Sequence, residues 1–523
     1  MRRHDAERSR VSALRRTLVP AVLVAALALS ACTSTVEQSS SAPAGDGTPQ
    51  AGGTLRTSVV DPGGDLDPVL TASPGGTGVV DSVTEKLAII NDKFEASPVL
   101  ATEWSATPDN LNWTFKIREG VKFNDGSTLV PADVVATYNR IIGPGSTSPA
   151  KGSFAGLLDT VQAQGESVVF SLKKPFADFP VLVAGNNTQI LPASYEVGSW
   201  KNSYIGTGPF TVKAFKPGQG VTLEKNPSYW NSDKIYLQTV EYKFFKDQQA
   251  RVLALQSGEV DGLYGEPISS NLTSALDESK LNVTSDPTTG FSAFAFRVDT
   301  APFDDVKVRQ AVAWALDRDA ISEKLYDGQS IEGNDTVYSS IYPVTPTGLE
   351  QRNANADKVK ELLADRKIKF TITTSSTEEG HALLIQQQLR KFDNFDVDVQ
   401  ILSSAEYFAD GDNAPWLSAP ATISYWGSRP VPSQFNDNLY RTGALWNASH
   451  YSNPTLDALF DQYDATSGKD ERAKIVDQIA EIQWTDVPVV ISAFPNTRRY
   501  LSKKLHMPYT PGNIDYTNVW IEH

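Results

Sequence analysis

The hydrophobic positions of this chain follow a different rhythm in each half. In the first half, apolar residues alternate with polar ones over short runs bounded by Gly, Pro and Asn, a pattern typical of half-buried strands. These runs predict strands within the following segments: 52–60, 113–123, 167–175, 205–230 and 291–298. Helical spacing of apolar residues predicts helices at 131–142, from 247 to about Gly258, and as a pair between 304 and 328.

One alternating run predicts a hairpin. Apolar residues at 113, 115 and 117 are followed by a turn at Glu119-Gly120, and the alternation resumes at Val121 and Phe123. Two short alternating runs around a Gly-containing turn are the usual signature of paired antiparallel strands.

Beyond residue 350, helices and strands alternate. Amphipathic segments at 356–366 and 378–392 are each followed by an apolar strand, at 368–374 and 395–402. Such alternation is typical of βαβ units and predicts a largely parallel sheet. Two more amphipathic helices and a buried strand follow, at 453–465, 469–484 and 487–494. The whole pattern predicts the α/β class.

The N-terminus has the composition of an export signal. Residues 1–16 hold six Arg and two acids, and the run from Leu18 to Ala31 is apolar except for Ser30. A basic segment before a short apolar run is typical of a secretory signal, and a membrane-spanning helix would need about 20 apolar residues. Cys32 ends this run and is the only cysteine in 523 residues, so the chain offers it no disulfide partner.

Residues 29–32 resemble the lipobox of bacterial lipoproteins. The resemblance implies that 1–31 is removed as a signal peptide and that Cys32 carries a diacylglyceryl anchor. Residues 32–51 are mostly Ser, Thr, Ala, Pro and Gly, a composition that cannot order itself and predicts a flexible tether. The predicted location is therefore extracytoplasmic, at the cell membrane, held by lipid at Cys32.

Charge and length narrow the possible functions. The formal net charge is −15, and removal of six Arg and two acids with residues 1–31 brings it to −19. Such a surface does not suit nucleic acid, which is bound by clustered Lys and Arg. The remaining body of about 470 residues is too long for one hydrophobic core and predicts two or more domains.

Seven phrases, in the same order from residue 52 to the C-terminus, resemble family 5 of the extracytoplasmic solute-binding proteins. They are the segment 100–141 and the shorter IGTGPFTV, LEKNPSYW, ALQSGEVD, APFDDVKVRQAVAWALDRDAI, HYSNPTLDALF and VPVV. The resemblance implies a bilobal periplasmic-binding-protein type II fold with a hinge. Lobe I would span 52–290 plus 496–523, with an extra subdomain at 96–199, and lobe II would span 291–495.

Members of this family are the dipeptide- and oligopeptide-binding subunits of ABC importers. The resemblance therefore implies a monomeric binding protein that closes two lobes around a small solute, such as a short peptide. The solute would be passed to permease and ATPase subunits at the membrane. No cofactor is implied. Closure would be a rigid-body motion about two crossovers, near 291–297 and 494–496, that is favoured by tighter binding in the closed state.

The segment ATISYWGSRPVPSQF, at 421–435, carries the candidate pocket. In the family it resembles, a strand delivers an aromatic residue and then an aspartate that pairs with the ammonium of a bound peptide. Here Tyr425 matches the aromatic residue and Ser428 occupies the aspartate position. A buried ammonium without a counter-ion is costly. Three possibilities follow: Ser428 and backbone carbonyls solvate the ammonium, another acid replaces the aspartate, or the ligand lacks that ammonium. The adjacent Arg429 suits a carboxylate or phosphate group of a ligand.

Further residues are predicted to line the pocket. Ser73 and Thr77 follow the first strand and would form part of the lobe I wall, whereas Phe291 lies at a crossover. The others are aromatic or amide side chains of the second half, for each of which a core position is the alternative: Trp416, Trp426, Trp446 and Asn447. Aromatic walls with few charges are typical of small-molecule sites.

Other functions receive less support. The chain contains no HExxH, CxxC or GxSxG motif, and its five His are widely separated, so neither catalytic residues nor metal ligands are predicted. A binding protein that serves an importer and one that serves a sensor would have the same two-lobed fold. These residues do not distinguish the two roles. Opines, sugars and chelates stay open as alternative ligands.

Overall fold

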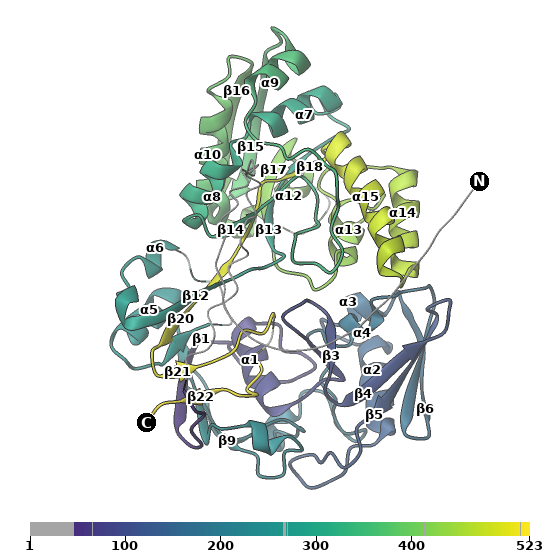
Figure 1. The fold of residues 1–523 in the computed structure, drawn as a ribbon, viewed down its shortest axis with the longest axis vertical. Helices are drawn as coiled ribbons and strands as arrows, with labels where there is room; N and C mark the ends of the chain where they lie inside the picture. Colours follow the sequence, from purple (N-terminus) through teal and green to yellow (C-terminus); the bar gives the residue numbers. More distant parts are fainter. Residues whose placement is uncertain are drawn as a thin grey trace, which may run out of the picture. The chain divides into compact units, whose positions relative to one another are not determined.

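Three sheets of four or more strands organise the described part of the chain (Figure 1). The computed structural model describes residues 47–64, 66–264, 268, 270–409, 411, 414–512 and 514–523. Cys32, the predicted signal peptide and most of the predicted tether lie outside the described residues.

A seven-stranded sheet forms from both ends of the described chain. Its order is β12-β20-β11-β1-β10-β9-β8. The strands are β1 (Thr54–Val60), β8 (Phe210–Lys216), β9 (Gly220–Lys225), β10 (Thr239–Phe245), β11 (Gly262–Leu263), β12 (Leu281–Asp286) and β20 (Thr497–Ser502). The parallel pairs of β1 with β10 and β11 lie at its centre, and the remaining pairs are antiparallel. The strands predicted at 52–60 and within 205–230 are confirmed.

A four-stranded antiparallel sheet lies between β1 and β8 in the chain. Its order is β4-β5-β7-β6, with β4 at Ala101–Ala106, β5 at Asn112–Ile117, β6 at Leu158–Gln164 and β7 at Ser167–Leu172. The predicted hairpin is wrong, because β5 pairs with β4 and β7 and not with 121–123. Val121 and Phe123 are buried instead in an irregular segment whose only bridge joins Lys122 to Thr128. The alternation at Val121 and Phe123 therefore reflects the burial of their side chains and not pairing with β5.

A five-stranded sheet is built from the second half. Its order is β16-β15-β17-β13-β18, with β13 at Phe291–Phe296, β15 at Ile368–Ser375, β16 at Phe395–Leu402, β17 at Ala421–Trp426 and β18 at Val489–Ile491. β15 runs parallel to β16 and β17, as the βαβ pattern predicts. β13 is antiparallel to both β17 and β18, so the sheet is mixed rather than largely parallel. An apolar strand pattern does not show the direction in which its partner runs.

Helices cover both faces of the five-stranded sheet (Figure 1). On one face, Phe294 and Phe296 pack with α7 (Val306–Ala315), α8 (Arg318–Tyr326), α9 (Ala356–Leu363) and α10 (Glu379–Leu389). On the other face, Phe291 and Ala293 pack with α13 (Ser433–Leu439), α14 (Pro454–Ala465) and α15 (Lys469–Asp486). Successive side chains of a strand point to opposite faces, so neighbouring residues of β13 and β17 enter different cores.

The remaining elements are short or cover the first two sheets. The helices are α1 (Pro74–Val83), α2 (Pro131–Ile142), α3 (Lys151–Phe154), α4 (Phe179–Leu182), α5 (Gln248–Gln256), α6 (Ser270–Thr273), α11 (Ser404–Tyr407) and α12 (Pro415–Ser418). Small sheets pair β2 (Ala88–Ile90) with β3 (Ala96–Pro98), β14 (Ser330–Glu332) with β19 (Ala493–Pro495), and β21 (Leu505–His506) with β22 (Trp520–Ile521). The buried strand predicted at 487–494 is present but divided at Ser492 into β18 and β19, which join different sheets.

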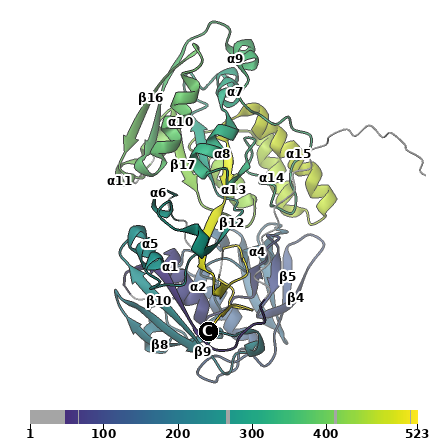
Figure 2. The same ribbon diagram turned by 60° about the vertical axis from the view of Figure 1, so that its left-hand side comes forward.

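Two neighbouring segments connect the seven-stranded and five-stranded sheets. The chain passes from β12 to β13 through 287–290 and returns from β19 to β20 through Asn496. β12 and β20 pair along their whole length, and Figure 2 shows them together. Thr288 Oγ1 donates to the carbonyl of Pro495 at 2.8 Å, and Asn496 Nδ2 donates to Ser285 Oγ at 3.0 Å. The two crossovers are thus held to one another.

A second set of contacts joins 110–178 to 464–472. Arg472 forms two hydrogen bonds with the Asp178 carboxylate, at 2.7 and 2.5 Å. Ala177 N donates to the carbonyl of Asp464 at 2.6 Å, and Asn110 Nδ2 donates to that of Ala465 at 2.9 Å. The four-stranded sheet region therefore contacts the α14–α15 pair.

One buried carboxylate is held by two guanidinium groups inside the α7–α15 region. Asp335 is fully buried and accepts two hydrogen bonds from Arg318 and one from Arg352, all at 2.8–2.9 Å. Arg318 also donates to the carbonyls of Gly333 and Ile491. Arg352 stacks on Trp484 at 3.8 Å. Removing the carboxylate charge would leave two desolvated cations without a counter-ion.

We expect Asp335→Asn to lower the free energy of unfolding by about 3–5 kcal/mol, because it breaks a buried ion pair. Equilibrium urea denaturation of the purified body measures this change. Asp398→Asn is the matched control, since Asp398 is half exposed and lies 3.5 Å from Arg390. Its loss should cost less than about 1 kcal/mol. Equal losses of unfolding free energy in the two variants would contradict the burial of the Asp335 ion pair.

Candidate functional site

The loop after β17 is tied to the crossover that precedes β13. Gly290 N donates to Ser428 Oγ at 3.2 Å. Arg429 N donates to Thr289 Oγ1 at 2.9 Å, and Thr289 Oγ1 donates to the Arg429 carbonyl at 2.8 Å. The Tyr342 hydroxyl donates to that carbonyl at 2.7 Å. The predicted site residues 425–429 therefore lie beside a connection between the two larger sheets.

Tyr425 is an exposed aromatic residue, with 45% of its surface accessible. It lies directly opposite Ser292 in the β13–β17 pair, so both side chains stand on the face that packs against α8 and α10. Its hydroxyl reaches the crossover, because a Cβ on Gly290 would lie 2.8 Å from it. Burial of this end raises the pKa of the Tyr425 phenol; the Glu378 carboxylate raises it further and Arg429 lowers it.

Glu378 brings a carboxylate to the same face. It ends the short 3₁₀ turn Ser376–Glu378 that follows β15, and it precedes α10. Ser292 Oγ donates to Glu378 Oε2 at 2.8 Å. The carboxyl ends of β15 and β17 lie at one edge of the sheet because these strands are parallel, and this is where open α/β sheets bind ligands. Glu378 is not among the site residues predicted from the sequence, although an acid directly after a predicted parallel strand is a usable signal.

Two further side chains complete this cluster. His381 is 6% exposed, and its Nδ1 lies 3.5 Å from Glu378 Oε2. Neither of its ring nitrogens makes a hydrogen bond among the described residues. Burial raises the pKa of the Tyr326 phenol, with a further rise from Glu378 and a lowering by a hydrogen bond with Ser292. Ser292, Tyr326, Glu378, His381 and Tyr425 are called the edge cluster below.

Arg429 lies next to the edge cluster. Its guanidinium is half-buried and has no carboxylate within ion-pair distance in the described part of the chain. Burial lowers the pKa of Arg429, whereas Tyr342 and Tyr425 raise it. An arginine in this setting suits an anionic ligand group, because a hydrogen-bonded ion pair would offset part of the free-energy cost of desolvating the guanidinium.

The three predicted pocket tryptophans lie on the opposite face of the sheet from Tyr425. Trp426 is 9% exposed and belongs to the α13–α15 core. Its ring centre lies 5.9 Å from that of Trp446, which lies 6.5 Å from that of Trp416. They line a cavity of about 10 Å³, space for about one water. The structure therefore does not bring these rings together with Tyr425, and their role as pocket walls stays a prediction.

Asn447 and Phe291 have internal partners in the same region. Asn447 is buried, donates to the carbonyls of Tyr451 and Arg441, and accepts from Ser449. Phe291 is fully buried and its ring packs on Phe435 at 4.8 Å. Neither side chain has a free polar or aromatic surface for a ligand here.

Ser73 and Thr77 lie at the start of α1. Ser73 Oγ caps the helix by accepting from Gly76 N at 3.3 Å, and Thr77 Oγ1 donates to the Ser73 carbonyl at 3.0 Å. Both residues are half-buried. Their local role is therefore capping of α1, and their contact with a ligand stays a prediction.

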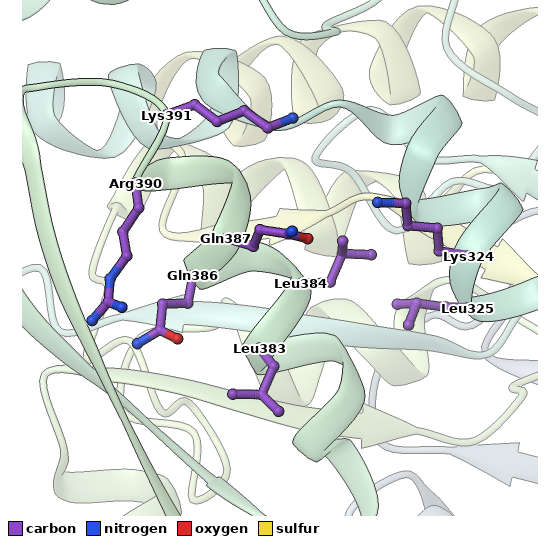
Figure 3. A pocket seen from close by; sticks show the side chains of 8 residues that line it. All are labelled: Lys324, Leu325, Leu383, Leu384, Gln386, Gln387, Arg390 and Lys391. Carbon is purple, nitrogen blue, oxygen red and sulfur yellow. The ribbon is translucent and has the colours of Figure 1, made fainter.

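A larger hollow lies on α8 and α10, outside the edge cluster. It measures about 630 Å³ and is lined by Lys324, Leu325, Leu383, Leu384, Gln386, Gln387, Arg390 and Lys391. Figure 3 shows Leu384 and Gln387 facing Leu325 and Lys324, whereas Leu383, Gln386 and Arg390 point away from them. It includes none of the predicted site residues. Among the described residues, no group of three or more His, Cys, Asp or Glu is placed to hold a metal ion, and no helix is long and apolar enough to cross a membrane.

Solved structures share this arrangement of sheets. The oligopeptide-binding protein AppA of Bacillus subtilis, in complex with a nonapeptide, matches with a TM-score of 0.69 at 24% identity, covering 91% of this chain and 100% of that one. AgaA of A. tumefacien R10, in complex with agropinic acid, matches with a TM-score of 0.69 at 22% identity, covering 90% and 99%. The fold is the bilobal periplasmic-binding-protein type II fold.

The sequence comparison gives the family. Residues 95–446 match the bacterial extracellular solute-binding proteins, family 5, and this chain belongs to that family. Oligopeptide-binding protein AppA of Bacillus subtilis (strain 168) is 26% identical, over 93% of this chain and 94% of its own length. The chain is therefore a substrate-binding protein of the ABC-importer type, a class of binding proteins rather than enzymes.

Gly290→Ala tests the close approach at the crossover. A Cβ at Gly290 would lie 2.8 Å from Tyr425 Oη, 3.0 Å from the Trp426 carbonyl and 3.1 Å from Ser428 N. We expect a loss of about 1–3 kcal/mol in the free energy of unfolding from this overpacking. Gly427→Ala is the control, because its Cβ would meet no atom within 4 Å. Urea denaturation of both variants measures the difference, and a neutral Gly290→Ala would refute the contact.

Proposed function

We propose that this chain captures a peptide-like solute outside the cytoplasm and delivers it to the permease and ATPase subunits of an ABC importer. Family 5 membership supports the transport role. The AppA relative, named as an oligopeptide-binding protein, supports the peptide class. The chain acts as a monomer in this proposal.

The capture step uses the two lobes of the fold. We assign 52–290 plus 496–523 to lobe I, with 96–199 as its extra subdomain, and 291–495 to lobe II. The paired crossovers at 287–290 and 495–496 then form the hinge. A solute that contacts both lobes binds the closed form more tightly and so shifts the population toward it.

One observation carries the peptide assignment. Tyr425 is exposed at the carboxyl edge of the five-stranded sheet, opposite Ser292, which bonds the Glu378 carboxylate, and four residues before Arg429 in the chain. A surface that offers an aromatic ring with charges of both signs fits a solute that is itself zwitterionic, as a short peptide is.

Native mass spectrometry of protein purified without denaturation tests this function directly. We expect a bound species with the mass of a short peptide, released on unfolding and unchanged in composition. Incubation with a mixture of tri- to pentapeptides, gel filtration and mass spectrometry of the retained peptides extends the test. Retention of no peptide, or recovery of a sugar, chelate or opine such as the agropinic acid bound by AgaA, would contradict the peptide class.

Tyr425→Ala should weaken retention of those peptides by about tenfold, because it removes an exposed aromatic contact of about 1–2 kcal/mol. Folding should change little, because Tyr425 is 45% exposed. Leu253→Ala is the control, since Leu253 is 54% exposed on α5. Isothermal titration with one retained peptide gives both affinities, and unchanged binding by Tyr425→Ala would exclude this pocket.

The lipid anchor belongs to the same proposal. Cys32→Ala should release the protein into the medium, because one or more acyl chains on Cys32 supply about 0.8 kcal/mol of membrane affinity per buried CH₂. Immunoblots of membrane and medium fractions measure this distribution. Ser30→Ala, which keeps Cys32 and a small residue before it, should stay with the membrane. Equal membrane retention of both variants would contradict anchoring at Cys32.

A further inference from the structure

The Glu378 carboxylate keeps one oxygen without a hydrogen bond from the described part of the chain. Oε2 accepts from Ser292, whereas Oε1 accepts no hydrogen bond from a described residue. No Lys or Arg of the described chain lies within ion-pair distance of it; only His381 approaches, at 3.5 Å and without a hydrogen bond. The side chain is 13% exposed, so it is largely desolvated but still reachable.

Two other buried carboxylates, Asp286 and Asp335, already have cationic partners. Asp286, at the end of β12, accepts from Arg499 at 2.5 Å. Asp335 accepts from both Arg318 and Arg352. A solute cation would have to compete with these fixed guanidiniums.

The surroundings of Glu378 hold it in one position. Ser292 faces Tyr425 across the β13–β17 pair, and its hydroxyl fixes one carboxylate oxygen. Glu378 is the cap residue of α10, where the helix N-terminus favours negative charge. Tyr425, opposite Ser292 in the β13–β17 pair, offers an exposed ring face for a cation.

We propose that Glu378 is the counter-ion for a primary ammonium group of the solute, with the Tyr425 ring as the adjacent wall. This assignment rests on the proposed capture of a peptide-like solute. It selects one of the three possibilities raised by Ser428, that of another acid in place of the missing aspartate. Ser428 itself lacks charge, and its Oγ accepts from Gly290 N.

The test uses the peptide mixture in two forms, one with free N-termini and one N-acetylated, offered together to the full-length protein. We expect wild type to retain the free form over the acetylated form by about 10- to 100-fold, the range for a hydrogen bond to a charged group. Glu378→Gln should bring this ratio close to one, mainly by loss of the free peptides. Mass spectrometry of the retained peptides gives the ratio.

Glu379→Gln is the matched control, because it removes the neighbouring exposed acid of the same helix and should keep the wild-type ratio. A Glu378→Gln variant that keeps the wild-type ratio overturns the role of Glu378 while the peptide function stands. Equal retention of free and acetylated peptides by the wild type overturns the role of Glu378 without any variant. Retention of neither form by wild type refutes the proposed function, and this assignment with it.

Ser292→Ala provides a second variant should Glu378→Gln fail to fold, as judged by circular dichroism. This variant keeps the charge of Glu378 and removes the Ser292 hydroxyl that holds the carboxylate in position. We expect the ratio to fall by about threefold or more, because the charge-assisted hydrogen bond that orients the Glu378 carboxylate is lost. A ratio equal to that of wild type would contradict the fixed carboxylate.

Discussion

The pairing of the two crossover segments is the constraint on which the candidate site depends. β12 and β20 form a six-residue antiparallel ladder, and the Asp286–Arg499 ion pair buries its charges beside it. The ladder ends where Thr288 bonds the carbonyl of Pro495. This fixes the point at which β13 begins, and in the β13–β17 pair Ser292 lies opposite Tyr425. Because side chains alternate along a strand, a shift of one residue would move Tyr425 to the other face.

That register explains why neighbouring residues have different environments. Tyr425 faces Ser292 and the edge cluster, whereas Trp426 faces Phe291 and enters the α13–α15 core. The loop after Trp426 then turns back to the crossover, where Gly290 leaves room for the Tyr425 hydroxyl. Backbone hydrogen bonds from Gly290 and Arg429 hold this loop without using a charged side chain. In the described part of the chain, Glu378 has no Lys or Arg partner and Arg429 has no carboxylate partner.

A buried charge network belongs to the scaffold of this chain. The family match covers 95–446, and it includes the buried Arg318 that, with Arg352, holds Asp335. Such buried charge networks are costly to break, so they preserve the lobe rather than the choice of ligand. In the proposed function, ligand choice rests instead on a few side chains at the sheet edge, among them Tyr425 and Glu378.

Local sequence determined most elements of the fold, because burial imposes a period of two on strands and 3.6 on helices. The helix at 131–142, the helix pair between 304 and 328, and the β15–α10–β16 unit could all be predicted in this way. The pairing of distant strands could not be predicted. The alternation at Val121 and Phe123 reflects burial but does not identify a partner strand, and the apolar residues of β13 do not show whether its partners run parallel or antiparallel to it. For the same reason the sequence pointed to Tyr425 and Arg429 but not to Glu378. Glu378 is 47 residues from Tyr425 in the chain, and only the parallel pairing of β15 with β17 brings it to the same edge.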